Sequence, residues 1–157
     1  MPIFIKNIIN TVIIYLCLCI VLLPLNLLWE GYIWHDSQWE RWMLKDIIIQ
    51  WFSIGIHTTI SLFLFLFLGR KFLIKTNNTF LNIISVLTIS AIVAIIIIII
   101  YKEANSNRWG GLFVVPIYPI SETISYFFKI GEKYGYLSMS VLPSLAMWIG
   151  MITKRLP

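Results

Sequence analysis

Residues 46–69 read DIIIQWFSIGIHTTISLFLFLFLG, a stretch that is long and apolar enough to cross a lipid bilayer. A helix advances about 1.5 Å per residue, so this stretch covers the roughly 30 Å of the hydrocarbon core. Five of its polar residues recur at helical spacing, and on a helical wheel they fall within an arc of about 80°: Asp46, Gln50, Ser53, His57 and Ser61. The sequence therefore predicts a transmembrane helix that carries one narrow polar stripe.

The composition of the whole chain indicates a membrane protein. Of its 157 residues, 59% are hydrophobic and 12% are charged, whereas a soluble domain carries about 25% charged residues. Such a chain lacks the polar groups to cover a globule in water, and its mean hydropathy is +0.87. We expect a single all-α integral membrane domain over residues 1–157. Its richness in Ile and Asn is typical of AT-rich genomes and favours a bacterial origin.

Four apolar segments predict four transmembrane helices in a compact bundle. They cover residues 8–28, 47–69, 80–101 and 134–152. Two long connectors, 29–46 and 102–133, lie between the first and second and between the third and fourth. Pro143, Ala146 and Gly150 share a face of the last segment, and small residues there favour close helix packing.

Both connectors carry features of the membrane interface. The first contains four Trp residues, which prefer the headgroup level, and it predicts a short interfacial helix at about 37–45. In the second, Pro116 and Pro119 interrupt any continuous helix. Apolar residues recur at helical spacing after them and predict an interfacial helix at about 121–130. A re-entrant loop is the rival interpretation, whereas a fifth span would place Glu122 in the bilayer at a cost of about 2.5–3.5 kcal/mol.

The distribution of charge predicts the orientation. With four spans, one side of the membrane holds both termini and the turn at 70–79, and it carries no acidic residue. Its six basic residues lie within short segments: Lys6, Arg70, Lys71, Lys75, Lys154 and Arg155. The two connectors also carry six basic residues, but spread over longer segments and mixed with all seven acidic residues. Short loops dense in Lys and Arg stay in the cytoplasm, so we expect a multi-pass protein of the cell membrane with both termini inside.

His57 is the strongest candidate for chemistry, because an ionisable residue near the bilayer midplane is a functional hypothesis by default. The stripe Gln50, Ser53, His57 and Ser61 can line a proton or substrate path, or it can hydrogen-bond across helices, which is worth about 1 kcal/mol. No predicted span contains a second His, an Asp or a Glu. That absence disfavours a proton relay and a metal site, and it favours interhelical hydrogen bonds.

A second group of candidate residues lies in the outward connectors. Asp36 and Glu40 are one helical turn apart and follow His35, and such a set can hold a divalent ion. The spacing matches no established zinc motif, so a solvated acidic loop is the favoured interpretation. Together with Glu122, these residues are the candidates for an interaction with a partner outside the membrane.

The chain shows no motif of an enzyme. It lacks a GxSxG element and a glycine-rich phosphate loop, and Cys17 and Cys19 are spaced too closely for a CxxC pair. Basic residues stand at the ends of apolar segments, which disfavours nucleic acid as a partner. We therefore expect no cofactor and no catalysis.

Two functional hypotheses remain from the sequence. The first is a non-enzymatic protein that acts through contacts with another membrane protein, as an accessory subunit or an immunity-type protein. The second is a small transporter or channel subunit that self-associates, with the polar stripe lining the path.

Overall fold

In the computed structural model, all regular secondary structure of the described residues is helical. It describes residues 2–36, 44–102, 116, 117, 121, 128, 129 and 132–154, with side chains in 2–25, 55–99, 116, 117, 121, 128, 129 and 134–154. The described residues form five helices: α1 (Ile3–Asp36), α2 (Leu44–Phe72), α3 (Thr79–Lys102), α6 (Glu132–Met139) and α7 (Leu142–Ile152). No strand occurs in these described ranges.

Three stretches of helix are long and apolar enough to cross a membrane: Ile3–Leu25, Thr79–Ile99 and Tyr134–Ile152. They correspond to three of the four predicted spans. The predicted span at 47–69 lies within α2, whose side chains before residue 55 fall outside the described part of the chain. The all-helical membrane fold is thus supported for the described residues by three helices.

The first connector begins later than the sequence predicted. Helix α1 continues through residues 29–36 and reaches 34 residues, or roughly 50 Å, because nothing after Pro24 breaks it before Asp36. Helix α2 already begins at Leu44, so the end of the predicted interfacial helix at 37–45 belongs to α2 instead. Residues 37–43 lie outside the described chain.

The described helices place apolar side chains outside and many polar ones inside. Exposed large apolar residues include Ile13 and Ile20 of α1 and Phe63 of α2. Ten polar residues are buried: Asn7, Thr11, His57, Ser61, Asn82, Ser85, Ser90, Ser121, Ser140 and Ser144. An apolar outer surface that extends over whole helices is unfavourable in water and favourable in lipid. This distribution agrees with the membrane assignment made from helix length.

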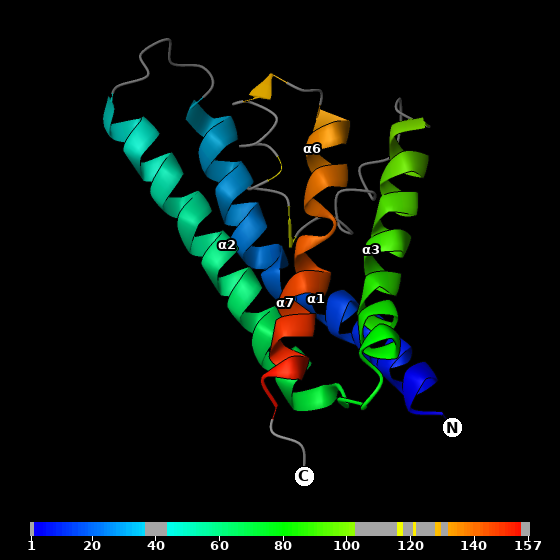
Figure 1. Cartoon of the computed structure of the whole chain (residues 1–157). Helices are drawn as coiled ribbons and strands as arrows, with labels where there is room; N and C mark the ends of the chain where they lie inside the picture. Colours follow the sequence, from blue (N-terminus) through cyan, green and yellow to red (C-terminus); the bar gives the residue numbers. More distant parts are fainter. Residues whose placement is uncertain are drawn as a thin grey trace.

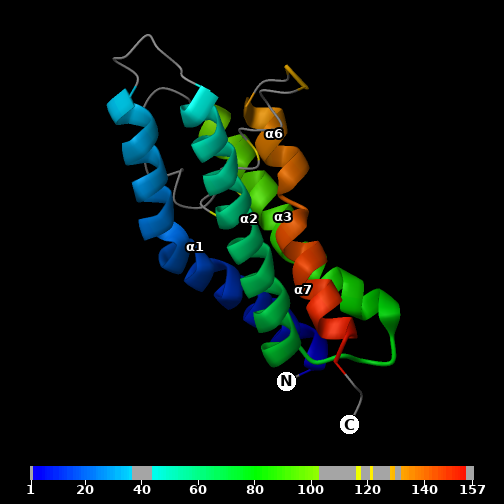
Figure 2. The same ribbon diagram turned by 90° about the vertical axis from the view of Figure 1, so that its left-hand side faces the viewer.

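Helices α1 and α7 each pack against both α2 and α3. Figures 1 and 2 show both chain termini at one end of the molecule, near the turn that joins α2 to α3. We call this the terminal end, defined by residues 2–10, 69–82 and 150–154. In Figure 1, α2 and α3 diverge toward the opposite end.

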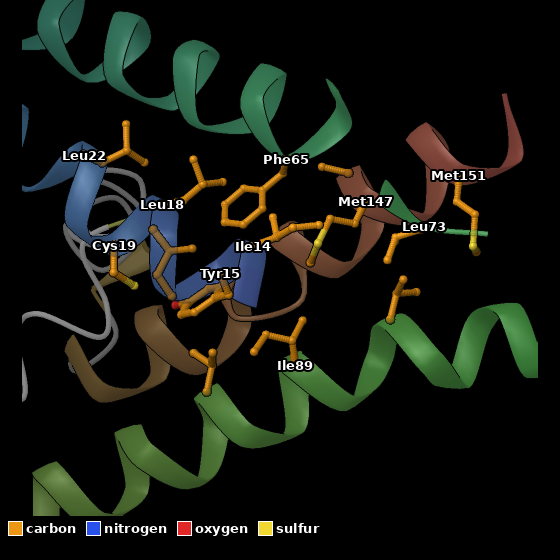
Figure 3. Packing of buried hydrophobic residues seen from close by; sticks show 14 of the residues in the cluster. Ile14, Tyr15, Leu18, Cys19, Leu22, Phe65, Leu73, Ile89, Met147 and Met151 are labelled. Atoms are coloured by element: carbon orange, nitrogen blue, oxygen red, sulfur yellow. The ribbon is translucent and has the colours of Figure 1, made fainter. Parts of the chain in front are cut away.

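The apolar core lies where these helices meet (Figure 3). Tyr15 of α1 stacks on Phe65 of α2 with ring centroids 5.9 Å apart. Ile89 of α3 and Met147 of α7 are buried in the same cluster. The Ile-rich half of α3 also contributes to the core, because Ile97 is fully buried although its neighbours Ile95, Ile98 and Ile99 are exposed.

Glycines bring α2 and α7 into close contact. A Cβ added to Gly69 would lie 2.6 Å from the Met147 carbonyl oxygen, and one added to Gly150 would overlap the Leu66 carbonyl oxygen. Ala146 and Pro143 are buried nearby on α7. The small-residue face that the sequence indicated on the last segment is therefore the face that meets α2.

The segment predicted as one helix at 134–152 is interrupted at Ser140–Val141 by a turn. Pro143 follows at the start of α7, where its missing N–H removes a bond to the preceding turn. A hydroxyl of α3 binds backbone at this break, since Ser90 Oγ donates to the Ser140 carbonyl oxygen at 3.0 Å. Ser144 Oγ of α7 donates to the Val86 carbonyl oxygen of α3 at 2.7 Å and links the two helices.

Replacing Gly150 by Ala is expected to destabilise the fold by about 1–3 kcal/mol, because the added methyl forces apart two helix backbones that cannot repack. Thermal unfolding in detergent, followed by far-UV circular dichroism, measures the effect. Gly55→Ala is the matched control, since a Cβ there meets nothing within 4 Å. Alanine favours the helix at that position by up to about 1 kcal/mol. Equal unfolding temperatures for the two variants would contradict the close approach.

Candidate functional site

The polar stripe of α2 points into the molecule as far as its side chains are described. His57 is 5% exposed and Ser61 is 2% exposed, although both lie in a strongly apolar helix. Gln50 and Ser53 lie in the first half of the same helix, but their side chains fall outside the described part. The structure thus brings two of the four predicted stripe residues, His57 and Ser61, to the inner face of α2.

Ser61 binds the backbone of the second connector. Its Oγ donates to the Pro116 carbonyl oxygen at 2.9 Å, a contact between residues 55 positions apart. Pro116 and Ile117 are both buried. The connector therefore enters the interior beside the middle of α2.

Ser121 continues this buried segment. It is fully buried, and both its N–H, at 3.0 Å, and its Oγ, at 2.8 Å, donate to the Ile117 carbonyl oxygen. These hydrogen bonds close one helical turn and satisfy backbone that no water reaches. The interfacial helix at 121–130 and the re-entrant loop both stay predictions. Residues 122–127 of the predicted interfacial helix are outside the described chain.

A small cavity lies beside the Ser61–Pro116 hydrogen bond. Its volume is about 10 Å³, and its lining includes Thr58, Ser61 and Pro116 together with Leu142 and Pro143 of α7. The Thr58 Oγ1 atom is buried and has no hydrogen-bond partner among the described residues. A space of this size is at the lower limit for one water molecule, and a water there would satisfy the Thr58 hydroxyl. The site holds backbone together and has room for a water, not for an organic substrate.

The second group of candidates falls largely outside the described part. His35 and Asp36 form the last residues of α1, but their side chains are not described, and Glu40 and Glu122 lie outside the described ranges. Among the described residues no group of three His, Cys, Asp or Glu comes together as a metal site. The interaction proposed for these four residues stays a prediction.

The polar contacts of the terminal end were not predicted from the sequence. The Asn7 side chain pairs with the backbone of Ile74: its Nδ2 donates to the Ile74 carbonyl at 2.8 Å, and its Oδ1 accepts from the Ile74 N–H at 2.9 Å. Asn82 makes the same two-way pairing with Thr76, at 2.8 and 3.0 Å. Lys75 Nζ donates to the Ile152 carbonyl at the end of α7, at 3.2 Å. An Asn near the end of an apolar run was the available signal for both amide contacts.

Comparison of the chain with protein-family models, with curated proteins and with solved structures finds no match. The site must therefore be interpreted from its own geometry.

Replacing Ser61 by Ala is expected to loosen the connector, because the Pro116 carbonyl loses its donor. A cysteine placed at Ile117, in a background with Cys17→Ala and Cys19→Ala, reports the opening through its rate of reaction with a maleimide. A hydrogen bond of this kind contributes about 0.5–1.5 kcal/mol, so Ser61→Ala should raise the rate about two- to tenfold.

Ser138→Ala is the matched control for this experiment, because Ser138 is exposed and its hydroxyl donates to Gly135 within its own helix. That variant should leave the rate unchanged. Equal rates before and after the Ser61→Ala substitution would show that the hydroxyl does not hold the connector.

Proposed function

We propose that this is a multi-pass protein of the bacterial cell membrane that acts through contact with another membrane protein and catalyses no reaction. The observation that carries this proposal is the inward orientation of His57 and Ser61, with Ser61 closed off by the Pro116 carbonyl. A Ser61 hydroxyl that donates to internal backbone is less suited to line a path within one molecule. The part of the chain left to act is its outer surface and its connectors.

Four crossings, packed as a bundle, are part of this proposal. The start of α1, the turn after α2 and the end of α7 lie together, because Asn7 binds Ile74 and Lys75 binds Ile152. Termini at the same end of a membrane protein require an even number of crossings. The three apolar helices together with α2 give that number.

The orientation follows from the charge at the terminal end. Lys6, Arg70, Lys71, Lys75 and Lys154 belong to this end, and no acidic residue occurs in 2–29, 47–102 or 134–154. Basic residues flanking transmembrane segments are retained in the cytoplasm. We infer that the terminal end is cytoplasmic and that both long connectors face outward.

A reporter protein fused after Pro157 tests this orientation. An alkaline phosphatase fusion should be inactive and a green fluorescent protein fusion should be fluorescent, because phosphatase folds only outside the cytoplasm and the fluorescent protein only inside it. The same pair inserted after Ser37 should give the reverse result. Active phosphatase at the C-terminus would contradict an even number of crossings with the N-terminus inside.

Purification from native membranes in a mild detergent tests the contact function. The expected result is a second membrane protein recovered in a fixed ratio, measured by quantitative mass spectrometry after crosslinking. His57→Leu should retain this partner, because on this proposal the imidazole contributes only about 1 kcal/mol of internal hydrogen bonding.

Transport by a self-associated form is the second candidate, favoured by the cavity at Thr58 beside the stripe. It predicts the opposite pair of results: a homo-oligomer without a fixed partner, and ion flux in liposomes that His57→Leu abolishes. The two functions are thus separated by the same preparation and the same variant.

A further inference from the structure

One face of α2 is exposed along the whole described part of the helix and joins an apolar ridge to two positive charges. We call it the lipid face; its members are Ile56, Ile60, Phe63, Phe67, Arg70 and Lys71. At about 100° per residue, these six positions fall within an arc of about 100°. All six are exposed, Phe63 to 63% and Phe67 to 49%. His57, Ser61 and Phe65 lie outside this arc and are buried in the molecule.

The apolar part of the lipid face is a firm surface. The rings of Phe63 and Phe67 stack on each other, with centroids 6.3 Å apart and planes inclined by 16°. Two stacked rings one turn apart form a continuous ridge parallel to the helix axis. Such a ridge offers apolar contact to an acyl chain that runs along the helix axis.

The charged part of the lipid face has no acidic neighbour on its own helix. The nearest acidic residue on α2 is Asp46, more than twenty residues from Arg70, which is over 30 Å along a helix. Lys71 Nζ lies 5.4 Å from the centroid of the Phe72 ring, which draws its side chain toward that ring. Lys75, in the turn that follows, already donates to the Ile152 carbonyl. In the part of α2 with described side chains, Arg70 and Lys71 are thus the cations that remain for an external anion.

We propose that the lipid face binds an anionic phospholipid, with its phosphate at Arg70 and Lys71 and an acyl chain along Phe63 and Phe67. The two parts of the face have the order that a phospholipid requires, since the cations follow the apolar ridge within one helical turn. Cytoplasmic leaflets are rich in anionic lipids that attract Lys and Arg near the headgroups. The ligand is the membrane lipid and not free phosphate, because only a lipid uses both parts.

A second copy of this chain is a poor occupant for the same face. Two copies in one membrane pair about an axis along the membrane normal, which would place Arg70 and Lys71 of one copy against those of the other. Like charges in such an interface cost binding energy. The lipid face therefore favours a ligand of opposite charge over self-association.

Thermal unfolding of the full chain in a neutral detergent tests this proposal. Added phosphatidylglycerol should raise the unfolding temperature by several degrees, in a concentration-dependent manner, because it binds the folded state. Phosphatidylcholine with the same acyl chains, and inorganic phosphate at the same concentration, should give little or no rise. The rise should fall in 1 M salt, where the Debye length is about 3 Å.

Variants show whether the binding is local. Arg70→Gln combined with Lys71→Gln should weaken the apparent affinity about thirtyfold, since each charge near the membrane surface contributes a factor of about five. Lys6→Gln, at the same end of the molecule but on α1, is the control and should change the affinity much less. Phe63→Leu with Phe67→Leu should also weaken binding, whereas Phe80→Leu on α3 should not; Phe80 is exposed as well.

Three results would overturn the proposal. The first is equal stabilisation by the anionic and the neutral lipid. The second is an equal loss of affinity for Lys6→Gln and for the α2 pair, which would indicate diffuse attraction to the whole basic end. The third is a dimer in which crosslinking places Phe63 and Phe67 of the two copies at the interface. None of these outcomes depends on whether a protein partner co-purifies, so the proposed contact function is tested separately.

Discussion

The arrangement of the helices depends on how the short turn between α2 and α3 satisfies its backbone. Residues 73–78 leave the helices in a short turn, in which Leu73 is buried and residues 74–76 are half-buried. Unpaired N–H and C=O groups there would be costly, and the amides of Asn7 and Asn82 pair with Ile74 and Thr76 in both directions. Each asparagine amide pairs with the N–H and the C=O of one backbone residue, as a neighbouring backbone segment would. The turn thereby fixes α1 and α3 to the end of α2.

This fixed end determines which sides of α2 are used. Once the turn is held, Gly69 and Gly150 let α7 approach α2 closely enough for backbone to meet backbone. The inner side of α2 is then occupied by α1, α7 and the second connector, through Phe65 and Ser61. The lipid face remains outside. His57 and Ser61 of the polar stripe are thus buried on one side of α2, and the aromatic ridge is exposed on another.

Much of this could be predicted from the sequence, because lipid imposes a simple pattern. Apolar length gave three spans that the structure supports, and the helical wheel placed His57 and Ser61 on one face, which is the buried one. The helix ends were less predictable, since Trp29 and its neighbours are compatible with both a helix and an interface. The partners of Ser61 and Asn7 could not be predicted at all, because they are backbone groups 55 and 67 positions away. Every residue has a backbone carbonyl, so the spacing of residue types in the sequence does not indicate which carbonyl is the partner.

Two of the buried hydroxyls bind backbone at or near a proline. Pro143 breaks the last helix, and at that break Ser90 donates to the Ser140 carbonyl; Pro116 lies in buried connector backbone, and Ser61 donates to its carbonyl. Irregular backbone is tolerated at membrane depth where a hydroxyl satisfies the groups that helix formation would have satisfied. Ser61 and Ser90 thus satisfy irregular backbone inside the fold. This structural role of Ser61 supports the contact function that we propose over transport along the α2 stripe.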